Sequence, residues 1–96
     1  MRNYEMMFIV KSGIDADKAK EEVENIKKII TSGKGKISKV DEMGQRKLAY
    51  PIKKEISGVY YVFTFDCDKE TLSELDRRIK INENILRHLI IRLDEE

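Results

Sequence analysis

Hydrophobic residues recur along the chain with two alternating kinds of spacing, which predict strands and helices in turn. Alternation at every second residue starts at Tyr4, whereas steps of three or four residues place Ala19, Val23 and Ile26 on one face of a helix. Applied to the whole chain, these patterns predict strands over residues 3–10, 37–52, 59–66 and 85–93, and helices over residues 16–32 and 69–81.

Short polar residues and glycines mark the boundaries of these elements. Asp15 and Asp68 stand directly before the helices, where a side-chain oxygen can accept a hydrogen bond from a free backbone N–H, and Gly33 ends the first helix. Gly44 lies inside the long second strand and predicts a bulge or bend there. Residues 53–58 are predicted to turn the chain into the third strand.

The order strand, helix, strand, strand, helix, strand predicts an α+β protein with the ferredoxin-like βαββαβ fold. Two split βαβ units with right-handed crossovers make a four-stranded antiparallel sheet with both helices on one face. Alternating Tyr61, Phe63 and Phe65 predict the core side of a central strand. The sheet face without helices should display Met7, Ile9, Tyr60, Val62 and Thr64. This composition is compatible with a binding surface, although scattered exposed apolar residues are also ordinary.

Length and composition limit the classes of function. A chain of 96 residues is predicted to form one domain over residues 1–96, too small for a separate cofactor-binding lobe. Its 19 lysine and arginine residues nearly balance its 18 aspartate and glutamate residues, so any nucleic-acid site has to be a local patch. The longest apolar run, residues 6–10, is too short for a membrane span or a signal peptide. The single cysteine fits a reducing compartment, and we expect a soluble, cytoplasmic protein.

Side chains with catalytic or metal-binding chemistry are few and isolated. His88 has no second histidine or cysteine set around it and no nucleophile to serve, which predicts a packing or surface histidine. Cys67 shares the core parity of the aromatic strand, which indicates a small buried hydrophobe rather than a reactive thiol. The adjacent acids Asp41 and Glu42 point apart on a strand and cannot act as a pair. We expect no catalytic residue, no metal, no cofactor and no small-molecule substrate.

Basic residues in the strands are the best lead to a partner. Arg46 and Lys47 interrupt an otherwise apolar strand, and successive strand residues point to opposite faces, so at least one of them faces away from the core. Pro51 lacks the N–H that a sheet ladder needs and predicts that this strand lies at the edge of the sheet. A basic, open strand edge suits contact with a polyanion.

A second group of cations is predicted at the ends of the first and last strands. The antiparallel order brings Arg92 close to Arg2 and Tyr4, and Arg87 lies near the start of the last strand. Guanidinium groups can make bidentate contacts with phosphate, and an aromatic ring can stack on an unpaired base. These residues favour nucleic-acid contact slightly over simple solvation.

With the strand order in place, the chain resembles the family of the bacterial small-subunit ribosomal protein number six over essentially all 96 residues. The most specific segment is Gly-Gln-Arg-Lys-Leu-Ala-Tyr-Pro-Ile at residues 44–52, supported by residues 1–5 and 82–87. Glu83 stands where the family usually has aspartate, and Leu86 where some members have arginine.

The resemblance implies a non-enzymatic structural component of the small ribosomal subunit in the cytoplasm. It implies binding to the central domain of small-subunit rRNA together with ribosomal protein number eighteen. The isolated chain, expected to be a monomer, should bind RNA weakly because a basic partner shares the phosphate contacts. Together with the cation pattern, the resemblance gives candidate rRNA contacts at Arg2, Tyr4, Arg46, Lys47, Tyr50, Arg87 and Arg92. The predicted protein-partner face comprises Met7, Ile9, Tyr60 and Val62.

Three other interpretations fit the same fold class. A free-standing single-strand RNA-binding module of the RNA-recognition-motif type would need aromatic rings facing outward from the central strands, and residues 57–62 match that signature poorly. An acylphosphatase-like hydrolase would need an anion-cradling loop, which residues 11–15 do not provide. A module that binds only proteins through the open sheet face is the third alternative.

Overall fold

The computed structural model describes residues 2–14, 16–52 and 54–93, and it contains the six elements that the spacing predicts. The predicted cap Asp15 lies outside the described residues. No helix in the described ranges is long and apolar enough to cross a membrane. The elements are β1 (Arg2–Lys11), α1 (Ala16–Ser32), β2 (Lys36–Ile52), β3 (Glu55–Cys67), α2 (Lys69–Lys80) and β4 (Ile85–Arg92).

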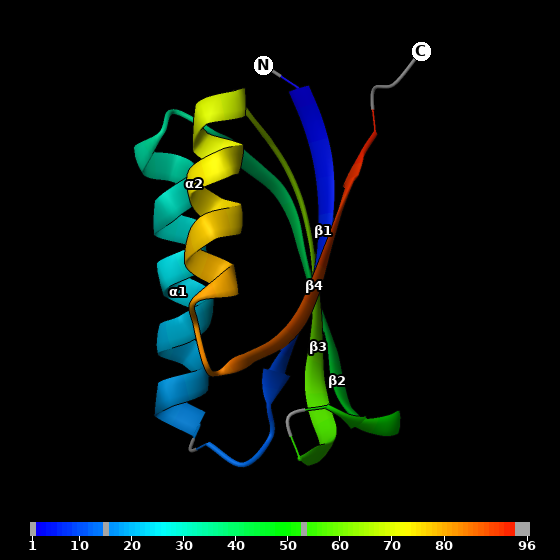
Figure 1. The fold of residues 1–96 in the computed structure, drawn as a ribbon. Helices are drawn as coiled ribbons and strands as arrows, with labels where there is room; N and C mark the ends of the chain where they lie inside the picture. The colour runs from blue at the N-terminus through cyan, green and yellow to red at the C-terminus, as the bar shows by residue number, and fades with distance from the viewer. Residues whose placement is uncertain (1, 15, 53, 94–96) are drawn as a thin grey trace.

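The strands form one antiparallel sheet in the order β2-β3-β1-β4, with both helices packed on the same side (Figure 1). This arrangement confirms the ferredoxin-like prediction. The aromatic strand β3 lies inside the sheet between β2 and β1, as its buried alternation indicates. Pro51 belongs to the edge strand β2, so its missing N–H breaks no ladder between two inner strands.

The main core lies between the helices and one face of the sheet. Phe8 packs against Tyr61 and Phe63, with ring centroids 5.2 Å apart in each pair. Leu75 from α2 and Ile30 from α1 are fully buried against this layer. Strands β1 and β3 therefore each turn one parity towards the helices, and in both it is the parity that the sequence predicts.

The second helix begins where the sequence predicts. The carboxylate of Asp68 accepts a hydrogen bond from the backbone N–H of Thr71 at 2.8 Å, which satisfies one of the free donors of the first turn. Thr71 also lies against Gly33, where an added Cβ would clash with the Thr71 side chain. A glycine after α1 therefore lets the two helices approach closely.

One feature of the β2–β3 hairpin confirms the sequence prediction, and another corrects it. Gly44 has a φ of 88° and stands where the register shifts after Glu42, which confirms the predicted bulge. The predicted turn over residues 53–58 is too long, because β3 already begins at Glu55, which pairs with Ile52. Lys54 takes the left-handed conformation, with a φ of 68°, and so reverses the chain in less space.

Substituting one leucine on each sheet face tests which face contributes more to the free energy of unfolding. Leu75→Ala removes a fully buried side chain from the helix-side core and is expected to lower the free energy of unfolding by about 3 kcal/mol. Leu89→Ala on the other face, where the side chain is 53% exposed, should change it by less than about 0.5 kcal/mol. Urea unfolding followed by circular dichroism measures both. Equal losses for the two variants would contradict this assignment of the core.

Candidate nucleic-acid interface

A second, smaller apolar cluster lies on the sheet face that carries no helices. It joins Ile9 of β1, Leu48 of β2 and Leu86 of β4, with Ile52 and Tyr60 packed around them. Ile9 is only 6% exposed, so its prediction as a partner-facing residue is wrong. The physical reason is that Leu48 of β2 packs over Ile9 of β1 on the open face, although these two strands are not neighbours in the sheet.

The cover is a bulged part of β2, residues 48–51, which we call the β2 arm. Between Lys47 and Ile52 strand β2 advances five residues, whereas its partner β3 advances two, from Ser57 to Glu55. The surplus residues leave the ladder, and the far end of β2 bends out on the side opposite the helices (Figure 1). Leu48 turns inward and is buried, and Tyr50 stays 55% exposed.

The β2 arm also makes a polar contact with β4. Arg87 donates a hydrogen bond from Nη1 to the Tyr50 hydroxyl at 2.8 Å, and its guanidinium carbon lies 5.8 Å from the centre of the Tyr50 ring. A register shift in β4, opposite Ile9 and Val10, places the consecutive residues Leu86 and Arg87 on the same open face. Leu86 joins the apolar cluster there, and Arg87 pairs with Ile9, which brings it within reach of Tyr50. The structure therefore brings together two predicted RNA contacts, Tyr50 and Arg87.

Arg46 lies at the same end of the open face. It pairs with Gly58 of β3, which in turn pairs with Lys11 of β1, so one row across the sheet holds a cation on each side of a glycine. Lys11 was missed by the sequence reasoning, although it shares the parity of Met7 and Ile9 that marks the open face.

Lys47 points to the other face of β2, as the strand geometry requires. Within residues 2–14, 16–52 and 54–93, no carboxylate forms an ion pair with Arg46, Lys47 or Arg87.

The rest of the open face holds a group of apolar residues beside polar ones such as Glu5 and Thr64, which pair with each other. Met7 pairs with Val62 on one side and with Leu89 on the other, and Glu5 pairs with Ile91. Leu89 and Ile91 are 53% and 47% exposed, and Met7 is 38% exposed. Of the predicted partner residues, Met7 is therefore exposed, whereas Val62 and Tyr60 are half-buried. We call Met7, Val62, Leu89 and Ile91 the apolar strip. The sequence alone does not show which side of β4 faces the helices, because both parities of this strand contain apolar residues.

The cations at the opposite end of the sheet lie with the helix-side parity. Tyr4 pairs with Arg92, and Arg2 belongs to the same parity of β1 as Tyr4. Tyr4 itself is only 4% exposed and packs on Phe65, with ring centroids 5.9 Å apart. The expectation that its ring stacks on a base is therefore wrong, because the alternation of β1 turns that ring into the core. Arg2 is half-buried and Arg92 exposed.

The isolated histidine and cysteine behave as packing residues. His88 faces α2, where its Nε2 lies 2.7 Å from Oδ1 of Asp76. This hydrogen bond, followed by the one from Lys80, holds the pKa of Asp76 below its usual value. Cys67 is fully buried, and burial raises the pKa of its thiol to about 11, which leaves it protonated and unreactive. No group of three potential metal ligands occurs among the residues that the structure describes.

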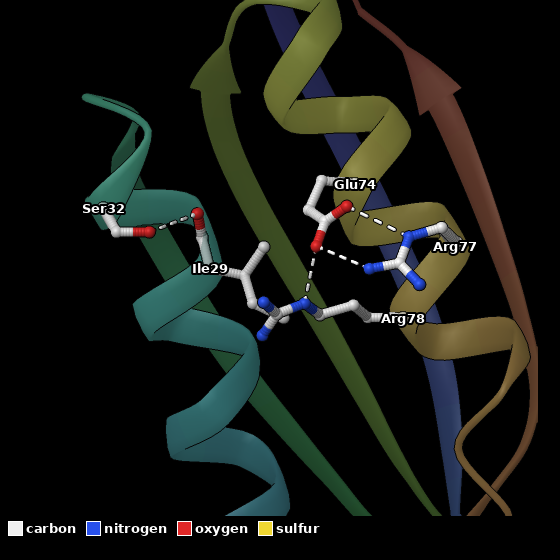
Figure 2. Close-up of polar contacts among 5 residues, drawn as sticks. All are labelled: Ile29, Ser32, Glu74, Arg77 and Arg78. Atoms are coloured by element: carbon white, nitrogen blue, oxygen red, sulfur yellow. Dashed lines mark hydrogen bonds and ion pairs between the residues drawn. The ribbon is translucent and has the colours of Figure 1, made fainter.

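A groove of about 890 Å³ runs between α1 and α2, on the side of the molecule away from the open face. Arg78 extends from α2 towards α1, where Ile29 lies (Figure 2). Glu74 binds Arg77 and Arg78 together, and these hydrogen bonds lower the pKa of Glu74 to about 2. The arginines of the groove are thus paired with an acid, in contrast to Arg46 and Arg87.

The fold and this surface define a class of protein: a small ferredoxin-like α+β protein that carries basic and apolar patches on its open sheet face. Comparison with known proteins narrows the class. The sequence model of the family "Ribosomal protein S6" matches residues 3–92. The chain therefore belongs to the ribosomal protein S6 family.

Curated relatives agree with this assignment. The small ribosomal subunit protein bS6 of Syntrophomonas wolfei is 43% identical over 97 residues, covering 100% of both chains. The protein of the same name from Campylobacter hominis is 43% identical over 96 residues, which are 100% of this chain and 66% of that relative.

A solved structure shares the fold. The crystal structure of 30S ribosomal protein S6 from Thermotoga maritima superposes with a TM-score of 0.90 at 42% sequence identity, over 96% of this chain and 87% of that one. Family membership confirms the predicted class, a structural ribosomal protein and not an enzyme.

The contact between His88 and Asp76 predicts how stability changes in acid. Because the folded pKa of Asp76 lies below its ordinary value of 3.8, its contribution is present above that value and is lost as the pH falls through the folded pKa. Asp76→Asn should therefore be less stable than wild type at neutral pH, and the two urea-unfolding curves should converge in acid.

The matched amide substitution Asp41→Asn, on β2, serves as the control and should follow the wild-type pH profile more closely. A constant difference between Asp76→Asn and wild type at every pH would contradict the role given to this carboxylate.

Proposed function

We propose that this chain is a structural component of the small ribosomal subunit in the bacterial cytoplasm. There it binds the central domain of small-subunit rRNA together with ribosomal protein number eighteen. The observation that carries the proposal is the division of one sheet face into two parts. Lys11, Arg46 and Arg87 lie at one end of that face, and the apolar strip lies beside them.

The basic end suits RNA and the apolar strip suits protein. Lysine and arginine side chains without acidic partners can approach phosphate groups without first breaking an ion pair. Met7, Leu89 and Ile91 present apolar side chains in adjacent register positions, which suits a protein surface rather than a charged sugar-phosphate backbone. One partner of each kind can therefore occupy this face at the same time.

The net charge supports joint binding. The whole chain carries a formal net charge of only +1, because its acidic residues nearly balance its cations, so the chain attracts a polyanion only weakly at long range. A basic protein partner that contributes further phosphate contacts would supply the missing affinity. Arg2 and Arg92, at the other end of the sheet, and Lys47, on the opposite side of β2, are proposed as additional RNA contacts.

A free-standing RNA-recognition-motif module is less well supported. That class stacks bases on aromatic rings that face outward from its central strands. Here Tyr61, Phe63 and Phe65 of β3 are buried on the helix side, and Tyr60, on the open face, is half-buried beside the second apolar cluster. The open face therefore offers few rings to unpaired bases.

Two substitutions on the open face should have different effects. Arg46→Glu should weaken binding of the chain, with ribosomal protein number eighteen present, to a central-domain rRNA transcript by about tenfold, and should lower the slope of log affinity against log salt by about one. Val62→Asn should mainly weaken binding to the protein partner, because it places an amide in the apolar strip. Filter binding at several salt concentrations measures the first effect, and calorimetry without RNA measures the second.

Lys28→Glu, on the exposed face of α1, is the matched charge reversal and should leave both affinities within about twofold of wild type. Reversed outcomes, with Val62→Asn affecting only RNA and Arg46→Glu only the protein partner, would contradict the division of the face. A wild-type chain that does not join the small subunit at physiological salt would contradict the function itself.

A further inference from the structure

Tyr50 and Arg87 form a pair whose parts come from the two opposite edges of the sheet. The order β2-β3-β1-β4 separates their strands by two others, and the β2 arm closes this gap. Both side chains remain exposed after they meet, and Tyr50 keeps more than half of its surface in solvent. The contact therefore lies on the surface of the basic end and not inside the apolar cluster below it.

The fold does not need this pair in order to close the arm. Leu48 anchors the arm, because it is buried against Ile9 and Leu86. Tyr50 adds a hydrogen bond and a cation–π contact that are both open to water, where such contacts stabilise a fold only slightly. The pair is thus better placed to organise a surface than to hold the molecule together.

The geometry leaves part of the arginine available. A guanidinium has five N–H donors, and the Tyr50 hydroxyl uses one of them, at Nη1. Among the described residues no carboxylate pairs with Arg87, so Nε and Nη2 can still form the planar fork that fits two oxygens of one phosphate. Holding the guanidinium over a ring in the free protein also removes side-chain freedom that binding would otherwise have to remove.

We infer that Tyr50 is a positioning residue that presents Arg87 to a phosphate group of the RNA backbone. This inference rests on the proposed function and deepens it, because it assigns the phosphate contact to Arg87 and an indirect role to Tyr50. The tyrosine hydroxyl fixes the direction of the guanidinium, and the ring lies within cation–π distance of it. The β2 arm is then the element that couples the hairpin of β2 and β3 to the RNA-contacting start of β4.

A double-mutant cycle tests this role by measuring affinity for the central-domain rRNA transcript in the presence of ribosomal protein number eighteen. Tyr50→Phe keeps the ring and loses the hydroxyl, so binding should weaken about two- to fivefold, and Tyr50→Leu should weaken it further. In the Arg87→Ala background the same two changes should have no further effect. Arg87→Lys should lose most of the arginine contribution, because an ammonium cannot form the fork.

The matched controls are Tyr61→Phe on the core side of β3 and Arg78→Lys in the helix groove, both expected to bind RNA like wild type. Unfolding midpoints in urea should be nearly unchanged for Tyr50→Phe, which separates positioning from a structural role. Equal losses from Tyr50→Phe with and without Arg87 would show direct RNA contact by Tyr50 and overturn the inference.

Wild-type affinity that survives both Tyr50→Leu and Arg87→Lys would also overturn the inference while leaving the proposed function intact. Absence of any wild-type binding would overturn both.

Discussion

Both helices of this chain pack on the same face of its four-stranded sheet, and the other properties of the molecule depend on the opposite face having no helices. The helix-side face takes the aromatic residues Phe8, Phe63 and Phe65, which are completely buried in the main apolar cluster. The opposite face has to carry polar side chains, be covered by another segment of the same chain, or bind a partner. In this chain all three solutions occur on different parts of the same face.

The β2 arm is the internal cover, and it decides where the candidate site lies. By burying Leu48 on Ile9 and Leu86, it removes apolar surface from one end of the open face. That end is then free to carry exposed cations, and the remaining apolar strip is confined to the other part of β1 and β4. Basic and apolar side chains are thereby separated on one continuous surface, which a ribonucleoprotein component that meets RNA and protein together would require.

The sequence predicts those parts of the structure that depend on local pattern. Alternation in β3 identifies the core parity, Asp68 marks the start of α2, and Gly44 marks a bulge, because each effect acts over a few residues. The cover of Ile9 by Leu48 could not be predicted, since it depends on a register shift in a hairpin and on contact between non-neighbouring strands. The parity of Lys11 already placed it on the open face, but its position in one row with Arg46 depends on the register of three strands.

Tyr4 is a candidate base contact because of its place beside cations, whereas the alternation of β1 predicts that its ring is buried. Its place beside two predicted cations suggested contact with a base, yet its parity already matched that of Met6 and Phe8, which are fully buried. The ring follows the strand and packs on Phe65. Tyr50 differs because the β2 arm has left the ladder, so parity no longer determines where its ring points, and the contact with Arg87 does.

We propose that the open sheet face is the assembly face. Hydroxyl-radical footprinting of the chain, free and within the small ribosomal subunit, tests it most directly, because Met7, Leu89 and Ile91 are exposed on that face and Ile81 is exposed at the end of α2. We expect strong protection of Met7, Leu89 and Ile91 in the subunit and little change at Ile81. Protection confined to Ile81 and the helix groove, with Met7 and Leu89 still oxidised, would contradict it.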